Sequence, residues 1–330
     1  MKRLDHASLR ADNTLRIDST AESLTIVESL EELDSVYADD LIVLGGGSNV
    51  VLTADHYRHV LMPRIMGIAI ADDHDDTVLV EAGAGVVWDD LVRWTVARDL
   101  WGIENLALIW GAVGAAPMQN IGAYGVELAD CFESLLALHL PTGKWRTFDK
   151  SACQFGYRDS WFKRQSRNQW LIASVQLRLS KSATRRLDYA GVAQALRGDS
   201  SPSAAQVAAA VSALRMRKLP DPKIIGNAGS FFKNPVLPAE FVGVLCKEHQ
   251  QLRAHSVSKN QAKISAGALI DMAGFKGYRV GDAGVSEQHA LVIVNHGAAR
   301  GKDILELANE IQAKIRSMFD IELEIEPVLI

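Results

Sequence analysis

Short apolar runs separated by polar or glycine-rich turns dominate the first half of the chain. Examples are "LIVLGGGSNVVL", "VLMPRI", "GIAIADDHDDTVLVEAGA" and "LLALHLPTGKWRTF". Runs of this length bounded by turn residues predict β-strands and hairpins. Helical patterns are fewer, and the clearest places Trp88, Leu91, Val92, Thr95 and Val96 on one face. This mixture predicts an α+β fold rather than strict alternation of strand and helix.

The second half of the chain is more helical. An alanine-rich segment after "RGDSSPS" predicts a helix that ends before Pro220 and Pro222, and we expect a domain boundary near there. "ALVIVN" predicts a strand, and "IELEIEPVLI" predicts a closing strand. Between them, one predicted helix has an apolar face made of Ile304, Leu307, Ala308, Ile311, Ile315 and Met318.

Composition excludes several classes of protein. The chain has 330 residues, 48% hydrophobic and 23% charged, with a formal charge of −5, which is typical of a globular protein and not of a general nucleic-acid binder. No signal-peptide or membrane-spanning pattern occurs, so we expect a cytoplasmic protein without membrane contact. The scattered Cys131, Cys153 and Cys246 predict reduced thiols. No metal-ligand spacing occurs, and His74 in "ADDHDD" predicts a solvated hairpin loop.

Three glycine-rich segments suggest a large ligand. "GGGSN" comprises Gly45, Gly46, Gly47, Ser48 and Asn49; it fails the dinucleotide fingerprint because Val50 stands where the last glycine belongs. Successive backbone N–H groups can still bind phosphate oxygens, although a tight turn is the favoured explanation of this segment taken alone. "EAGAG" at 81–85 and "GAVGAAPMQNIGAYG" at 111–125 add two more such segments. Together they favour a dinucleotide, with purely structural turns as the alternative.

"GNAGSFFKNP" places Ser230 in a bent segment near Lys218, Lys223 and Lys233. The serine is not in a Gly-x-Ser-x-Gly elbow and no histidine is tied to it locally, which disfavours a nucleophile. A phosphate ligand, a proton donor and a turn residue remain open. The lysines suit an anionic substrate.

Two charged residues have both structural and functional interpretations. Arg158 in "FGYRDSWFK" either forms a surface ion pair with Asp159 or grips a substrate carboxylate. Glu326 alternates with apolar residues in "IELEIEP", and period two predicts that its side chain is exposed.

The motifs "GGGSN", "GAVGAAPMQNIGAYGVE", "FGYRDS", "KLPDPKIIGNAGSFFKNP" and "LEIE", in this order, resemble those of the UDP-N-acetylenolpyruvoylglucosamine reductase family. The resemblance implies FAD-binding domains of the PCMH/vanillyl-alcohol-oxidase-like type at 1–66 and 67–217, and an α+β substrate domain at 218–330 whose last strand returns to the active site. It also implies a monomer that uses FAD and NADPH to reduce UDP-N-acetylglucosamine enolpyruvate in peptidoglycan synthesis.

The resemblance assigns residues. Ser230 would protonate C2 of the substrate, while Arg158 and Glu326 would stabilise charge on its carboxylate. Cofactor contacts are implied for Gly45, Gly46, Gly47, Ser48, Asn49, Gly111, Gly114, Gln119, Asn120, Gly122, Ala123 and Tyr124. Substrate contacts are implied for Tyr157, Tyr189, Lys218, Asn234 and Gln288.

One residue departs from the family pattern: Trp110 stands where proline is common. Two alternative functions remain open at this stage, an FAD-linked hydroxy-acid oxidase or dehydrogenase and a non-catalytic flavin- or nucleotide-binding descendant.

Overall fold

The computed structural model describes residues 1–33, 40–165, 169–189 and 191–330. These residues form two compact units, each built from separated stretches of chain. The first unit contains 1–7, 20–47 and 56–216, and the second contains 8–19, 48–55 and 217–330. Each unit therefore depends on pairing between residues far apart in the sequence.

A small sheet opens the first unit. Its strand order is β1(Lys2–Ser8), β2(Thr20–Val27), β5(His56–Pro63), β3(Leu41–Val43), and both β2 and β3 run parallel to β5. The short helix α1(Leu30–Leu33) follows β2. Val27, Leu33 and Leu61 form its apolar core with Leu138 and Leu171 of the neighbouring sheet.

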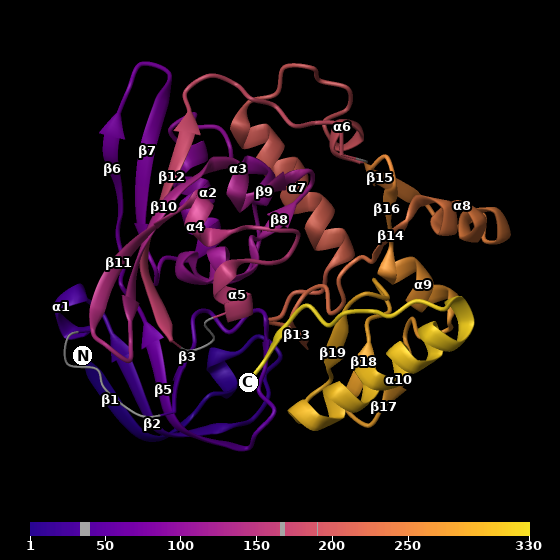
Figure 1. Cartoon of the computed structure of the whole chain (residues 1–330), viewed down its shortest axis with the longest axis horizontal. Coiled ribbons are helices and arrows are strands. Elements are labelled where there is room, and N and C mark those ends of the chain that lie inside the picture. Colours follow the sequence, from indigo (N-terminus) through magenta and orange to yellow (C-terminus); the bar gives the residue numbers. More distant parts are fainter. Residues whose placement is uncertain (34–39, 166–168, 190) are drawn as a thin grey trace. The chain divides into compact units, whose positions relative to one another are not determined.

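A five-stranded antiparallel sheet is the centre of the first unit (Figure 1). Its order is β11(Lys144–Asp149), β10(Phe132–His139), β12(Trp170–Ser180), β7(Thr77–Gly83), β6(Ile68–Asp73). The predicted hairpins β6–β7 and β10–β11 are confirmed, and "TGKW" is the turn of the second, where Gly143 has φ 65°.

Helices bury apolar faces in the core that this sheet helps to form. Helix α2(Trp88–Val96) buries Trp88, Leu91, Val92 and Thr95 as predicted, while Val96 is only half-buried. The alanine-rich helix α7(Ala204–Lys218) is also confirmed. The remaining elements of this unit are the 3-10 helices η2(Glu104–Leu106) and η3(Val113–Gln119), the strands β8(Gly122–Ala123) and β9(Val126–Glu127), and the helices α3(Leu128–Cys131), α4(Lys150–Cys153), α5(Trp161–Gln165) and α6(Val192–Ala195).

The second unit has two principal sheets. The first has the order β13(Gly226–Asn227), β19(Ile293–Asn295), β18(Ala283–Val285), β17(Arg279–Val280), and the second β14(Val236–Pro238), β16(Gln261–Ile264), β15(Ala254–Ser258). All of these pairs are antiparallel. The other elements are η1(Arg10–Asp12), α8(Ala239–Glu248), α9(Ala266–Met272), α10(Gly301–Phe319), and the parallel pair β4(Val50–Val51) and β20(Val328–Leu329).

Helix α10 packs beside β18 and β19 (Figure 1). Five members of its predicted face are buried, but Met318 is 44% exposed, so that assignment was wrong. Phe319 is buried in its place, and its ring packs edge-on against His249 with centroids 5.5 Å apart. The last turn of the helix therefore packs through its final residue.

The predicted closing strand is mostly wrong. In the segment 321–330, only Val328–Leu329 form a strand, while Ile325 makes an isolated bridge to Phe232. All three cysteines are free, as predicted. Among the described residues, no helix is long and apolar enough to cross a membrane, and no three His, Cys, Asp or Glu side chains cluster as metal ligands would.

Candidate active site

The three glycine-rich segments predicted from the sequence meet within the first unit. A Cβ at Gly46 would lie only 2.9 Å from the Gly111 Cα, and one at Gly114 would lie 2.6 Å from the Ala84 Cβ. Backbone hydrogen bonds join the last two segments, with Gly114 N donating to Ala84 O at 3.0 Å. Side chains at these glycines would force the backbones apart, so close approach explains why glycine stands there.

The first glycine segment offers backbone donors. Gly47 adopts φ 59°, and the N–H groups of Gly45 and Gly46 donate no hydrogen bond within the described part of the chain. Consecutive N–H groups in a tight glycine turn suit the oxygens of a phosphate group. Ser48 and Asn49 belong to the second unit, where Val328 N donates to Asn49 O at 2.9 Å.

The buried side chain of Asn120 holds the third glycine segment in place through hydrogen bonds. It is 1% exposed with φ 47°, and its Nδ2 donates to Glu127 Oε2 at 2.7 Å and to Gly156 O at 3.1 Å. Its Oδ1 accepts from Ala129 N at 2.9 Å. Both amide hydrogens are thus used within the protein, so Asn120 fixes the loop that carries Arg158. Its predicted cofactor contact stays a prediction.

Arg158 lies against the same glycine segment. Its Nη2 donates to Gly122 O at 2.6 Å, and a Cβ at Gly122 would lie 2.9 Å from Nη1. Asp159 pairs with Arg164. Arg158 itself has φ 54°, a left-handed conformation that is uncommon outside glycine and often found at functional sites. The Tyr157 ring lies 5.4 Å from the Arg158 guanidinium carbon.

Tyr124 and Tyr189 meet although they lie far apart in the sequence. Their rings pack edge to face with centroids 5.3 Å apart. Tyr189 is 46% exposed, so its hydroxyl-bearing ring is both positioned and accessible. The segment assigned to the cofactor and the loop assigned to the substrate are therefore neighbours.

The second unit brings the chain segment of Ser230 next to that of Glu326. Gly229, with φ 70°, bends the chain before Ser230, and its N–H donates to Asn227 Oδ1 at 3.0 Å. Phe231, which follows, is fully buried; its N–H donates to Leu291 O at 2.8 Å and its carbonyl accepts from Glu326 N at 2.9 Å. The half-buried serine therefore sits on a backbone fixed on both sides.

Glu326 is 9% exposed, so the prediction that it faces solvent was wrong. The alternation holds as far as Glu324: Ile321 and Leu323 are buried, while Glu322 and Glu324 are exposed. It fails afterwards because this segment is not a continuous strand, and the bridge from Ile325 to Phe232 turns the next side chain inward. Period two applies only where the strand is regular.

The residues around Ser230 have structural partners of their own. Lys233 pairs with the Glu324 carboxylate, and Asn234 Oδ1 accepts from Ala266 N at 3.0 Å at the start of α9. Lys223 is exposed. Gln288 is also exposed, with its N–H donating to Ser286 Oγ at 3.1 Å.

Lys218 acts electrostatically on His289. Burial lowers the pKa of His289, and the positive charges of Lys218 and Lys276 lower it further. His289 Nδ1 accepts from Leu291 N at 3.2 Å, so the neutral imidazole supports the residue whose carbonyl holds Phe231. Lys218 therefore lies close enough to His289 for its charge to lower that pKa.

Arg215 was missed at the sequence level. Its Nε donates to Leu108 O at 3.2 Å, and Leu108 N donates to Asp89 Oδ1 at 2.5 Å. Burial lowers the pKa of Arg215, the charge of Arg158 lowers it further, and Tyr124 and Asp89 act in the opposite direction. No local spacing announces such a residue, because its neighbours come from four separate segments.

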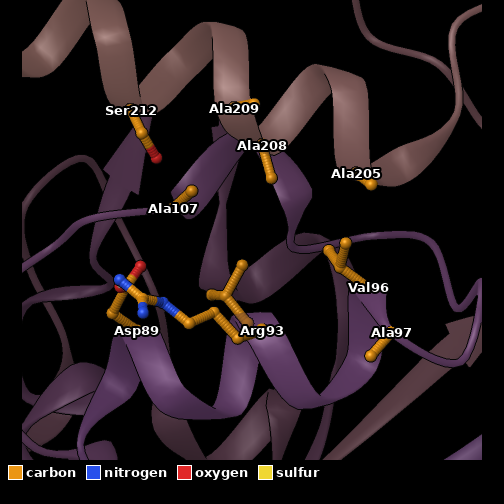
Figure 2. A pocket seen from close by; sticks show the side chains of 10 residues that line it. Asp89, Arg93, Val96, Ala97, Ala107, Ala205, Ala208, Ala209 and Ser212 are labelled. Carbon is orange, nitrogen blue, oxygen red and sulfur yellow. The ribbon is translucent and has the colours of Figure 1, made fainter.

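Asp89 also lines a groove of about 420 Å³ between α2 and α7 (Figure 2). There it pairs with Arg93, one turn along α2, while Ala208 and Ser212 of α7 lie opposite. Leu108, hydrogen-bonded to both Asp89 and Arg215, has φ 59° and lies three residues before the third glycine segment. Trp110, two residues on, is 37% exposed. The two helices thus fix the entry to the glycine segment.

Comparison with known proteins agrees with this arrangement. Residues 20–149 match the FAD binding domain family, and residues 221–330 match the C-terminal domain of UDP-N-acetylenolpyruvoylglucosamine reductase. The fold is that of a flavin-dependent oxidoreductase.

The relatives are similar over nearly their full lengths. The chain is 47% identical to the UDP-N-acetylenolpyruvoylglucosamine reductase of Pseudomonas aeruginosa, covering 98% of both chains. It is 45% identical to that of Polynucleobacter asymbioticus, covering 97% of this chain and 94% of the relative. The crystal structure of the Thermus caldophilus reductase matches with a TM-score of 0.69 at 28% identity, over 99% and 98% of the two chains. The chain belongs to the UDP-N-acetylenolpyruvoylglucosamine reductase family. It is an FAD- and NADPH-dependent oxidoreductase of peptidoglycan precursor synthesis.

Proposed function

We propose that the chain reduces UDP-N-acetylglucosamine enolpyruvate to UDP-N-acetylmuramate with the residues described above, as a cytoplasmic monomer that binds neither nucleic acid nor membranes. The observation that carries the proposal is the fixed pairing of the Ser230 segment with Glu326 in the second unit, together with Arg158 on the glycine segment of the first. The names of the matched relatives support the substrate.

FAD fits the residues of the first unit. The unpartnered N–H groups of Gly45 and Gly46 suit its diphosphate, and the close glycine backbones leave room for a flat ring system. Contacts from Gly111, Gly114, Gln119, Gly122, Ala123 and Tyr124, and from Ser48 and Asn49, belong to the same proposal. When bound, FAD supplies the capacity to take hydride from NADPH and to give it to C3 of the enolpyruvyl double bond.

Arg158 stabilises the negative charge that develops when C3 gains hydride. Electron density then moves towards C2 and the adjacent carboxylate. A guanidinium held in place before the reaction lowers the energy of this charge without reorganisation. The hydrogen bond to Gly122 O and the left-handed backbone hold Arg158 in that way.

Ser230 and Glu326 complete the addition. The Ser230 hydroxyl gives its proton to C2, which becomes strongly basic as charge accumulates, so that a weak acid suffices when it is well placed. The buried Glu326 lies beside the Ser230 backbone segment and would help to hold the substrate carboxylate.

The substrate is an anionic sugar nucleotide that carries a diphosphate and a carboxylate, and polar groups of both units suit it. Tyr189 is assigned to its diphosphate, and Tyr157, Lys218, Asn234 and Gln288 are assigned to the substrate or its diphosphate. Tyr189 is accessible and held by Tyr124, as a phosphate-binding hydroxyl requires.

Separate half-reactions test the proposal. Purified protein should be yellow and should bleach with NADPH under anaerobic conditions. Ser230→Ala should bleach at the wild-type rate yet fail to reoxidise with the enolpyruvyl substrate, and Ser230→Cys, which retains a proton donor, should recover part of that step. Equal loss of both half-reactions would assign Ser230 a structural role. Turnover with oxygen and a hydroxy acid, without NADPH, would favour an oxidase instead.

A further inference from the structure

A buried asparagine joins the two loops that meet at Tyr124 and Tyr189. Asn105 is completely buried in η2, and its Nδ2 donates to Tyr124 O at 2.9 Å and to Arg186 O at 2.8 Å. Tyr124 lies in the third glycine segment, and Arg186 lies three residues before Tyr189. One amide group therefore connects the glycine segment to the loop assigned to the substrate.

The orientation of this amide is determined by its partners. Both neighbours are carbonyl oxygens, so turning the amide over would place Oδ1 against two acceptors. In the observed orientation Oδ1 has no hydrogen-bond partner among the described residues. Buried polar atoms normally have partners, and such exceptions call for an explanation. Here the two donated bonds determine the geometry even though Oδ1 is left unsatisfied.

The loop beyond β12 has other attachments at its ends and along its length, because Leu187 packs against the core of the first unit and the Arg185 guanidinium carbon lies 5.2 Å from the Trp101 ring. Trp101 N donates to Ser180 O at 2.8 Å, and Lys181 N donates to Asp76 O at 3.0 Å. Further along, Arg185 Nε donates to Pro202 O at 2.9 Å, which closes the loop on itself. The middle of the loop is exposed at Arg185, Arg186 and Tyr189.

At the middle of the loop, Asn105 supplies a polar attachment, while the Tyr124 ring and the core packing of Leu187 supply apolar ones. The Tyr189 Cβ also lies 3.9 Å from the position a Cβ would take on Gly125. The attachment is therefore directed at one place on the glycine segment. A loop attached there carries the Tyr189 hydroxyl at a defined distance from Tyr124.

We propose that Asn105 is a positioning residue that fastens the Tyr189 loop to the glycine segment, so that the loop is ordered for the diphosphate of the nucleotide substrate. The inference rests on the proposed function, in which Tyr189 contacts the diphosphate of the substrate. Asn105 touches neither substrate nor cofactor in this role. Its effect is confined to where the Tyr189 hydroxyl is held.

Trypsin digestion measures directly how firmly the Tyr189 loop is attached to the glycine segment. Lys181, Arg185, Arg186 and Arg197 are cleavage sites in the loop, and Lys247, Arg253 and Lys259 in the second unit provide reference sites. In the holoenzyme, Asn105→Ala should raise the rate of cleavage after Arg185 and Arg186 at least tenfold relative to the reference sites, as judged by mass spectrometry. An unchanged ratio would overturn the proposal.

Kinetics report the consequence. Asn105→Ala should raise KM for the enolpyruvyl substrate at least fivefold and leave flavin bleaching by NADPH within twofold. Asn105→Asp is nearly isosteric with asparagine and keeps one donor when protonated. Its trypsin cleavage ratio and its KM should lie between those of the wild type and Asn105→Ala. This variant replaces Asn105→Ala if the alanine variant does not fold. Faster cleavage with an unchanged KM, or equal slowing of both half-reactions, would refute the positioning role.

A matched control separates this inference from the proposed function. Tyr189→Phe keeps the ring contact with Tyr124 and removes only the hydroxyl, so it should raise KM without raising the cleavage ratio. If it leaves KM unchanged, the assignment of Tyr189 to the substrate fails. The cleavage result for Asn105→Ala would still decide whether Asn105 fastens the loop.

Discussion

Arg158 Nη2 donates to Gly122 O at 2.6 Å, while Nη1 lies 2.9 Å from the place where a Gly122 side chain would begin. Glycine at 122 therefore leaves the space that the guanidinium occupies. The Arg158 side chain is thus bonded to the backbone of a segment assigned to the cofactor. In the proposed mechanism, stabilisation of the substrate charge by Arg158 therefore depends on the absence of a side chain at position 122.

Gly122→Ala should displace the Arg158 guanidinium. Because the displaced charge no longer meets the substrate carboxylate, reoxidation of reduced flavin by the enolpyruvyl substrate should slow at least tenfold, while bleaching by NADPH continues. Anaerobic stopped-flow absorbance measures both steps. Arg158→Lys, which keeps the charge but loses the guanidinium fork, should slow the same step. Normal reoxidation in both variants would contradict the assigned role of Arg158.

Gly46→Ala should disturb the contact between two glycine segments. The new Cβ would meet the Gly111 Cα at 2.9 Å, and backbone atoms cannot move aside as a flexible side chain can. We expect a loss of about 1–3 kcal/mol in the free energy of unfolding, and weaker FAD retention. Gly243→Ala is the matched control: it lies in α8 with open space around it and should stabilise the protein by about 0.4–1 kcal/mol. Denaturant titration and flavin fluorescence would show the contrast.

Asn234 has a structural role that a variant pair can separate from its substrate role. Its Oδ1 accepts from Ala266 N at the start of α9. Asn234→Ala should cost about 1 kcal/mol of stability, whereas Asn234→Asp keeps the acceptor and should keep the stability. If the amide also donates to the substrate, both variants should raise KM for the enolpyruvyl substrate. A wild-type KM in the stable Asn234→Asp variant would remove Asn234 from the substrate site.

His289 should make stability depend on pH. Its pKa in the folded protein is lowered below the usual 6.5, mainly by burial and then by Lys218. As the pH falls below about 6.5, the unfolded chain binds a proton that the folded protein resists, so stability decreases. His289→Asn should be less stable than wild type near neutral pH, and the difference should shrink towards pH 5. A difference that stays constant between pH 7.5 and 5 would count against the lowered pKa.

The hairpins and amphipathic helices could be predicted because each depends on a local period. Strands β6 and β7, the "TGKW" turn and the buried face of α2 follow from alternation and helical spacing alone. The glycine segments could be picked out as a group, and they do meet. The period-two alternation wrongly predicted that Glu326 is exposed, because the chain is irregular there and a single bridge turns the side chain inward.

The remaining features depend on contacts between residues far apart in the sequence, which local residue spacing does not reveal. Arg158 reaches Gly122 across 36 residues from a left-handed backbone, and Asn105 joins Tyr124 to Arg186 from a third segment. A left-handed arginine is disfavoured locally, so propensity argues against it. Such contacts exist only once the sheet has brought its connecting loops together.

Because β20 pairs with β4, the two units gain all of their residues at different times during synthesis. Val328 and Ile330 bond to the backbone of Asn49 and Val51, and Thr53 N donates to Ile330 O at 2.8 Å. During translation the first unit has all its residues once position 216 has left the ribosome. The second unit must wait for position 330 before residues 48–55 gain these partners. Asn49 therefore reaches its final hydrogen bonding only after the residues of β20 have been synthesised.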